Sequence, residues 1–168
     1  AKANVKMQSK IQSDALRFVG IIPARYASTR FPGKPLADIN GKIMIQRVYE
    51  KVLGILDDVY VATDDERILN AVEGFGGNAI MTSDQHKSGT DRCLEAYNKT
   101  GKEFDVIINI QGDEHFIQTE QIKALQDCFL DNDTQIATLV KAIDKNDESV
   151  LFNPNTPKVV LSKDNYAM

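Results

Sequence analysis

From residue 18 onward, short apolar runs alternate with segments of helical spacing, which predicts strands and helices in turn. "DVYVAT" is typical of a buried strand, whereas "IMIQRVYEKVLGIL" repeats its apolar residues Ile45, Val48 and Val52 at helical intervals. This order predicts an α/β fold with a mainly parallel sheet. The predicted strands are 18–22, 58–63, 78–82, 104–110, 135–143 and 157–162, and the predicted helices are 43–56, 65–75, 89–99 and 119–130.

Four polar segments directly follow predicted strands. They read "PARYASTR", "TDDE", "TSDQHKSGTDR" and "QGDEH". Because ligands of doubly wound sheets bind outside the carboxyl ends of the strands, we expect the functional residues in these segments.

The overall charge limits the kinds of ligand that the protein could take. The 168 residues include 20 basic and 24 acidic side chains, for a formal net charge of -4. This balance argues against a general nucleic-acid or membrane-surface binder, so any cationic site is expected to be local. No apolar run approaches the roughly 20 residues of a membrane helix, and the first residues lack a secretory apolar segment, which predicts a cytoplasmic protein.

Two further features concern organisation rather than chemistry. Residues 1–17 are polar and weakly patterned, and we interpret them as a loosely packed N-terminal arm or an added tag ahead of the folded domain. Cys93 and Cys128 are far apart and form no C-x-x-C pair, so we expect two buried, reduced thiols and no disulfide framework or zinc site.

The first polar segment concentrates positive charge. Arg25, Arg30 and Lys34 lie between residues 18 and 37, a stretch without an acidic residue. Arginine makes bidentate contacts with phosphate oxygens and lysine adds a mobile charge, so a polyphosphate is a suitable ligand; a solvated basic loop is the alternative. The segment is not a P-loop, since Ser28 stands where that motif needs glycine.

Two glycine-containing segments give weaker signals. "GFGGNA", 74–79, fits the dinucleotide fingerprint literally, but it follows a helix and precedes a strand, so we interpret it as a helix C-terminus. In "HKSGTDRC" polar donors surround Gly89 at a predicted helix start, which suits an anionic or polar ligand. A simple N-cap explains Ser88 or Thr90 equally well, and His86 is expected to be a surface residue.

The last segment, "QGDEH", places carboxylates at the end of a strong strand. Mg2+ binds through one or two carboxylates together with substrate phosphate oxygens, and Asp113 is well placed for that role. With the cationic loop, it suggests metal-assisted transfer at a nucleotide phosphate. A turn-forming aspartate is the alternative.

At this point the chain resembles a known family, the 3-deoxy-manno-octulosonate (Kdo) cytidylyltransferases or CMP-Kdo synthetases. The matching segments are "IPARYASTRFPGKPL", "VYVATDDERI", "HKSGTDR", "NIQGDE" and "FNPNTPKVVL", in family order from Phe18 to the last residue. The resemblance implies a three-layer αβα Rossmann-like nucleotidyltransferase fold with a mainly parallel, mixed sheet, and a nucleotide-binding domain over 18–168. It also implies a cytoplasmic, homodimeric, Mg2+-dependent enzyme that joins CTP and Kdo into CMP-Kdo and pyrophosphate for lipopolysaccharide biosynthesis.

The resemblance also assigns roles to single residues. It implies catalytic roles for Arg25, Lys34 and Asp113, with Asp113 as the metal ligand. The implied nucleotide-binding residues are Ala24, Arg25, Ser28, Arg30, Lys34, Ser88, Gly89, Thr90, Arg92 and Gln111. Within that set, the residues of the first loop would hold the triphosphate, and those from Ser88 to Arg92 would line the cytosine and ribose.

The chain departs from the family pattern in two respects. Ile43 and His115 stand where the family has prolines, and the family's C-terminal third, with sugar-binding residues and a second metal-binding aspartate, has no counterpart in the sequence. A non-catalytic CTP-binding fragment and a cytidylyltransferase for another acidic sugar are therefore the alternative hypotheses.

Overall fold

The computed structural model describes residues 16–27, 31–113, 117–144, 146–164 and 166–167. Most of the N-terminal arm predicted at 1–17 lies outside these residues. The chain divides into two compact units, Ala1–Ile122 and Lys123–Met168, a division that composition does not indicate. That 18–168 forms a single nucleotide-binding domain stays a prediction.

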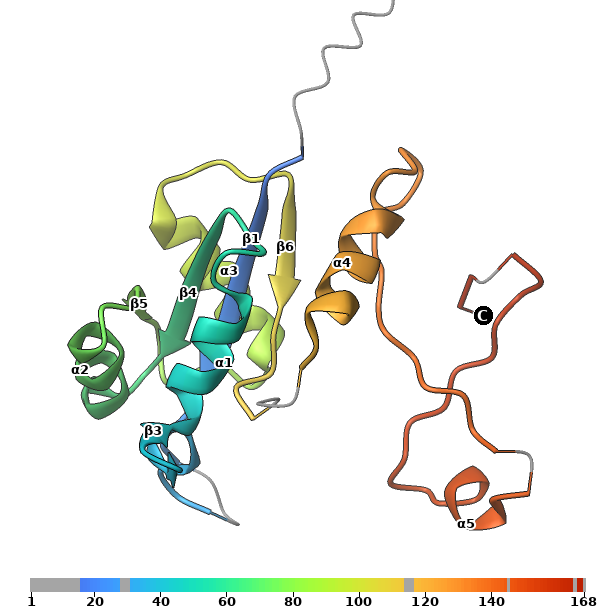
Figure 1. The fold of residues 1–168 in the computed structure, drawn as a ribbon, viewed down its shortest axis with the longest axis horizontal. Helices are drawn as coiled ribbons and strands as arrows, with labels where there is room; N and C mark the ends of the chain where they lie inside the picture. The colour runs from blue at the N-terminus through green and yellow to red at the C-terminus, as the bar shows by residue number, and fades with distance from the viewer. Residues whose placement is uncertain (1–15, 28–30, 114–116, 145, 165, 168) are drawn as a thin grey trace, which may run out of the picture. The chain divides into compact units, whose positions relative to one another are not determined.

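The first unit is built on four parallel strands (Figure 1). They lie in the order β5-β4-β1-β6, so that β1 pairs with both β4 and β6 at the centre of the sheet. The predicted mainly parallel α/β fold is thus confirmed. The strands are β1 (Phe18–Ala24), β4 (Asp58–Thr63), β5 (Ala79–Met81) and β6 (Val106–Asn109).

Helices cover both faces of this sheet, as Figure 1 shows for α1 and α3. Val19 and Ile21 of β1 form a buried cluster with Cys93 and Ala96 of α3. The alternate residue of β1, Gly20, faces Leu56 and Ile110, because successive strand residues point to opposite faces. The helices of this unit begin and end as follows: α1 (Met44–Val52), α2 (Glu66–Gly74), α3 (Gly89–Thr100) and, across the unit boundary, α4 (Thr119–Cys128).

Between β1 and α1 lies a small element that the sequence analysis does not predict. A 3-10 turn η1 (Lys34–Leu36) leads into an antiparallel hairpin of β2 (Asp38–Ile39) and β3 (Lys42–Ile43). Asn40 and Gly41 connect the strands with φ of 50° and 81°, values typical of a type I′ turn. The Asn-Gly pair between Ile39 and Lys42 is the sequence signal that predicts such a hairpin.

Three predicted elements are corrected by the structure. The helix expected at 43–56 ends at Val52, because Gly54 adopts a φ of 98° that no helix accommodates. The strands expected at 135–143 and 157–162 are wrong: the described residues there contribute one isolated bridge, Leu161 with Ala167. These β-prone segments lack a neighbouring strand among the described residues, and β-propensity largely reflects packing on such a surface.

The second unit contains little regular structure. Besides its part of α4 it holds α5 (Glu148–Leu151), a single turn capped by the Asp147 side chain. Ile136 and Phe152 are 89% and 73% exposed. In the part of the chain that the structure describes, no helix is both long and apolar enough to cross a membrane.

The two cysteines differ in environment. Cys93 is buried in α3, as expected, whereas Cys128 at the end of α4 is exposed, contrary to expectation. Burial raises the pKa of the Cys93 thiol to about 12. Both are free thiols.

Candidate functional site

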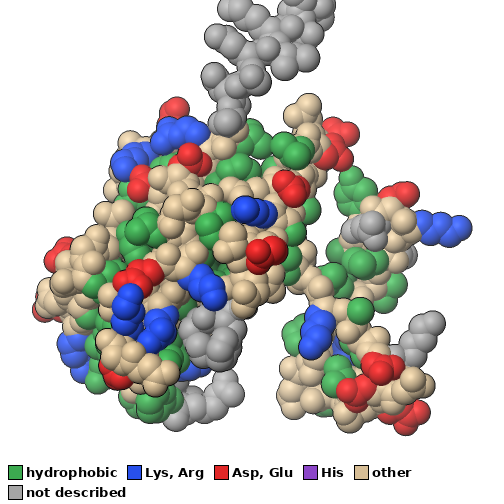
Figure 2. All heavy atoms as spheres, in the orientation of Figure 1, with side chains coloured by type: hydrophobic (Ala, Val, Ile, Leu, Met, Phe, Trp, Pro, Cys, Tyr) green, Lys and Arg blue, Asp and Glu red, His purple; other side chains and the backbone are tan. Residues whose placement is uncertain are grey.

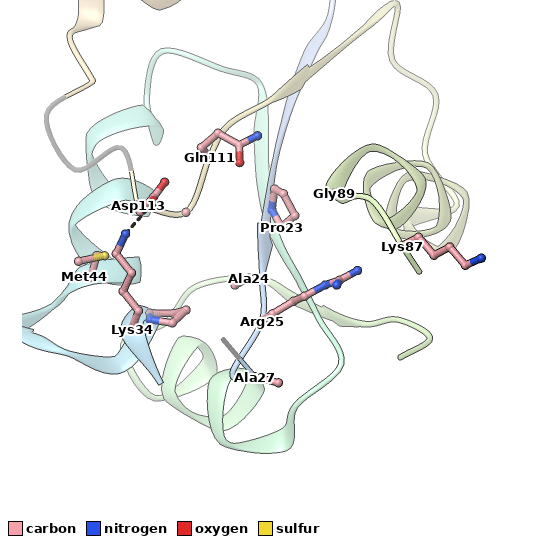
Figure 3. Close-up of a pocket in the computed structure, with 12 residues that line it drawn as sticks. Pro23, Ala24, Arg25, Ala27, Lys34, Met44, Lys87, Gly89, Gln111 and Asp113 are labelled. Atoms are coloured by element: carbon pink, nitrogen blue, oxygen red, sulfur yellow. Dashed lines mark hydrogen bonds and ion pairs between the residues drawn. The ribbon is translucent and has the colours of Figure 1, made fainter. Parts of the chain in front are cut away.

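A pocket of about 330 Å³ lies where β1 and β6 end and α3 begins (Figure 3). This is the edge of the sheet at which the sequence predicts the site. Its lining comes from Pro23, Ala24, Arg25, Ala27, Lys34, Pro35, Met44, Lys87, Gly89, Gln111, Gly112 and Asp113. In Figure 3 most labelled side chains surround a common space, while Lys87 points away from the others.

Close backbone packing brings these segments together at Pro23. A Cβ on Gly112 would lie 3.1 Å from the Pro23 carbonyl oxygen, and one on Gly89 would lie 3.3 Å from the Pro23 ring. Glycine at both positions therefore lets the end of β6 and the start of α3 approach the end of β1.

An ion pair joins the first loop to the β6 segment. Lys34 Nζ lies 2.6 Å from Asp113 Oδ2, and the two side chains are 40% and 54% exposed. An ion pair this exposed contributes little to stability. The ion pair is informative about position, because it places the predicted phosphate-binding lysine next to the predicted metal-binding aspartate in the wall of the pocket.

Arg25 connects the same loop to the segment before α3. Its guanidinium Nη2 donates a hydrogen bond to the backbone oxygen of His86. The His86 ring in turn contacts the carboxylate of Glu95, which also accepts from the Ser83 N–H and pairs with Lys99. Hydrogen bonds from Lys99, His86 and Ser83 lower the pKa of Glu95 to about 2, so Glu95 is a fixed anion that holds the segment 83–86 against α3.

Arg92 is buried between α3 and the sheet. The side chain is 0% exposed, and its two terminal nitrogens lie 2.6 Å from Asp64 Oδ2 and from Thr82 Oγ1. Arg92 thus ties α3 to the ends of β4 and β5 and does not line the pocket. Its Nε is buried and has no hydrogen-bond partner among the described residues. Sequence analysis names the "TDDE" segment but does not single out Asp64.

The predicted site residues therefore fall into three groups. The pocket gathers Ala24, Arg25, Lys34, Gly89, Gln111 and Asp113. Ser88, Thr90 and Arg92 are not among its lining residues; Ser88 is the N-cap of α3 and accepts from the Asp91 N–H, as the alternative interpretation expects. Ser28 and Arg30 lie outside the described residues. Which residues touch a nucleotide stays a prediction.

The oxygen donors of the pocket suit a metal ion that also binds oxygen atoms of a ligand. Among the described residues no group of three or more His, Cys, Asp or Glu side chains could enclose a metal ion. The Asp113 carboxylate and the Gln111 amide line the same pocket and offer hard oxygen donors. This donor set fits Mg2+ bound through one carboxylate and ligand phosphates, and not a cage made of protein alone.

In Figure 2 the Lys and Arg side chains that are coloured on this face are interspersed with Asp and Glu. A parallel α/β sheet with cations and a carboxylate in a pocket at its carboxyl edge is typical of the class of α/β proteins that bind phosphorylated ligands.

Comparison with known proteins identifies the family. A family model described as cytidylyltransferase matches residues 19–168, and the chain belongs to this family. The 3-deoxy-manno-octulosonate cytidylyltransferase of Parabacteroides distasonis is 68% identical over 155 residues, and that of Bacteroides thetaiotaomicron is 64% identical over 149. These alignments cover 91% and 88% of the chain, and the resemblance to Kdo cytidylyltransferases is confirmed.

Solved structures agree with this assignment. The structure of a CMP:2-keto-3-deoxy-manno-octonic acid synthetase complexed with CTP is 50% identical, with a TM-score of 0.66 over 70% of this chain and 49% of that one. A cytidylyltransferase from Leptospira borgpetersenii, 22% identical, shares the fold with a TM-score of 0.60 over 71% of this chain and 51% of its own. The chain spans 62% and 60% of the length of the two relatives above.

Proposed function

We propose that the chain is the nucleotide-binding part of a cytidylyltransferase that activates Kdo with CTP and releases pyrophosphate. The observation that carries this proposal is the pocket at the carboxyl edge of the sheet, which Arg25 lines and in which Lys34 pairs with Asp113. The substrates come from the relatives, which are named for this reaction and cover most of the chain.

The reaction needs little covalent participation from the protein. The anomeric hydroxyl oxygen of Kdo bonds to the α-phosphorus of CTP, the bond to pyrophosphate breaks, and the hydroxyl proton leaves to solvent. Arg25 and Lys34 hold the triphosphate and offset the charge that develops on the leaving group. Gly89 and Gln111 flank the nucleotide, and the exposed residues Ser88 and Thr90 lie beside Gly89.

Mg2+ is the proposed cofactor. Asp113 would be its protein ligand, with phosphate oxygens completing the shell. When bound, the ion neutralises phosphate charge and polarises the phosphoryl group. Lys34 then has to exchange its contact with Asp113 for one with phosphate, which the exposure of both side chains allows.

The wider context of the proposal follows from the family resemblance. We propose a role in lipopolysaccharide biosynthesis, in the cytoplasm, with a homodimer as the working assembly. Size-exclusion chromatography with light scattering tests the oligomeric state directly.

The first experiment compares CTP binding with turnover. Calorimetry should detect CTP binding by the full chain in the presence of Mg2+, and a pyrophosphate assay should detect release that requires Kdo. Binding without release would support the CTP-binding fragment, and release with a different sugar acid would support the other alternative. If CTP does not bind at all, the proposal fails.

Substitutions in the pocket test the proposed roles. Lys34→Ala should weaken CTP binding about ten- to a hundredfold, as expected for the loss of a charged hydrogen bond. Lys42→Ala is the matched control, since Lys42 also pairs with a carboxylate but lies in the hairpin. Asp113→Asn should chiefly reduce the dependence of binding on Mg2+; an unchanged Mg2+ titration would contradict the metal assignment.

A further inference from the structure

The segment "DDER", residues 64–67, follows β4 and has no role in the proposed reaction. It nevertheless contacts the first loop through Arg67. Asp65 caps α2 by accepting from the Arg67 N–H at 3.0 Å. Its carboxylate also binds the Arg67 guanidinium in bidentate fashion, with Nε to Oδ1 at 2.9 Å and Nη2 to Oδ2 at 2.6 Å. Two parallel hydrogen bonds fix the plane of the guanidinium.

That guanidinium stacks on an aromatic ring of the first loop. Arg67 Cζ lies 3.3 Å from the centroid of the Tyr26 ring, within the range of a cation–π interaction. Tyr26 lies between Arg25 and Ala27, which both line the pocket, but is not itself a lining residue. Neither Tyr26 nor Arg67 is therefore placed to touch the ligand.

Tyr26 also closes the loop on itself. Its carbonyl oxygen accepts the Gly33 N–H at 2.8 Å, directly before Lys34. Gly33 has a φ of 71°, and a Cβ there would lie 3.0 to 3.2 Å from two ring carbons and the hydroxyl oxygen of Tyr26. The ring thus packs against Gly33. Tyr26 therefore joins the two ends of the loop, one of which carries Arg25 and the other Lys34.

We infer that Tyr26 and Arg67 are positioning residues, which hold the base of the first loop so that Arg25 and Lys34 face a triphosphate. This inference rests on the proposed function. A loop fixed before binding loses less conformational entropy when the ligand arrives, so the anchor acts on nucleotide affinity. The anchor depends on α2, because Asp65 caps this helix and holds the Arg67 guanidinium in place. It is therefore formed before the ligand binds.

The test measures CTP affinity and thermal stability for matched variants of the full chain. Tyr26→Leu and Arg67→Gln should each weaken CTP binding about two- to fivefold, the range of an exposed cation–π contact. Their unfolding midpoints should stay close to that of the wild type. Tyr26→Phe keeps the ring and should restore wild-type affinity.

Two controls separate positioning from a general loss of structure. Arg17→Gln removes another cation–π contact, with Phe104 at 4.7 Å, at the opposite edge of the sheet from the pocket, and should leave CTP affinity unchanged. The double variant Tyr26→Leu, Arg67→Gln should bind CTP no more weakly than the weaker single variant, because both remove the same contact.

The outcomes are distinguishable. Failure of the wild type to bind CTP overturns the proposed function itself. Wild-type binding with unchanged affinity in Tyr26→Leu and Arg67→Gln overturns the positioning role alone. Equal losses in Arg17→Gln, or additive losses in the double variant, also overturn it.

Discussion

At the scale of single residues, burial decides what the two cysteines can do. Cys93 is 4% exposed and its pKa is raised to about 12, so at neutral pH it is a protonated thiol out of reach of reagents. Cys128 is exposed. Because only the accessible thiolate reacts, the two positions should behave as different chemical groups.

We therefore expect a thiol reagent at pH 8 to modify Cys128 rapidly and Cys93 only after unfolding. Mass spectrometry of peptides after timed alkylation measures both rates. Cys128→Ser removes the fast phase and serves as the control. Comparable rates at Cys93 and Cys128 in the folded protein would contradict the burial of Cys93.

Arg92 shows why some site residues cannot be assigned from sequence alone. Its motif suggests a ligand contact, but its partner Asp64 lies 28 positions earlier and is brought to it only by the packing of α3 on the sheet. Tyr26 was missed for the same reason, since its partner Arg67 belongs to another segment. By contrast, Arg25 and Asp113 lie in the segments that follow β1 and β6, and strand ends share one edge of a parallel sheet.

At the scale of elements, the contact of Arg92 with Asp64 fastens α3 to the sheet. We expect Arg92→Ala to lower the free energy of unfolding by about 3 kcal/mol, because it leaves a partly buried carboxylate without its cation. Urea denaturation measures the loss. Lys42→Ala, which breaks an exposed pair, should cost less than about 1 kcal/mol; similar losses for both would contradict the structural role of Arg92.

Glu95 fastens the segment before α3 in a manner that depends on pH. Its pKa is lowered from 4.5 to about 2, so the ionised form stabilises the fold above pH 4.5, and this contribution disappears as the pH falls from 4.5 toward 2. Glu95→Gln should be less stable than wild type at pH 7, and the difference should shrink on acidification. Denaturation at pH 7, 5 and 3.5 measures it, with exposed Glu103→Gln as control; a constant difference would contradict the assignment.

The predicted helices and strands agree with the structure where their apolar residues lie in the sheet or pack against it. The span expected for β4 agrees with the structure at both ends, and those for α2 and α3 differ by a residue or so, since Asp65 and Ser88 cap them. The strands expected at 135–143 and 157–162 failed although their residues are β-prone. A strand needs a hydrogen-bonded neighbour, and single-sequence patterns do not show whether one is present.

At the scale of the whole molecule, the two units should differ in resistance to proteolysis. Lys141 and Lys158 are exposed and lie outside helices and strands, whereas Lys51 is exposed but lies in the last turn of α1. Cleavage requires local unfolding, which costs more within a packed helix. Limited trypsin digestion should therefore cut at Lys141 and Lys158 before Lys51; the reverse order, read by mass spectrometry, would contradict this description.

The ion pair of Lys34 with Asp113 has a consequence for the kinetics of encounter. Since Asp113 already balances the charge of Lys34, the pocket attracts a distant polyanion less than its cations alone suggest. The chain as a whole carries a formal charge of -4 and repels that anion at long range. Added salt screens this repulsion, so the association rate of the nucleotide should fall little as the ionic strength rises. Proteins that steer anions across a basic surface show a steep fall instead.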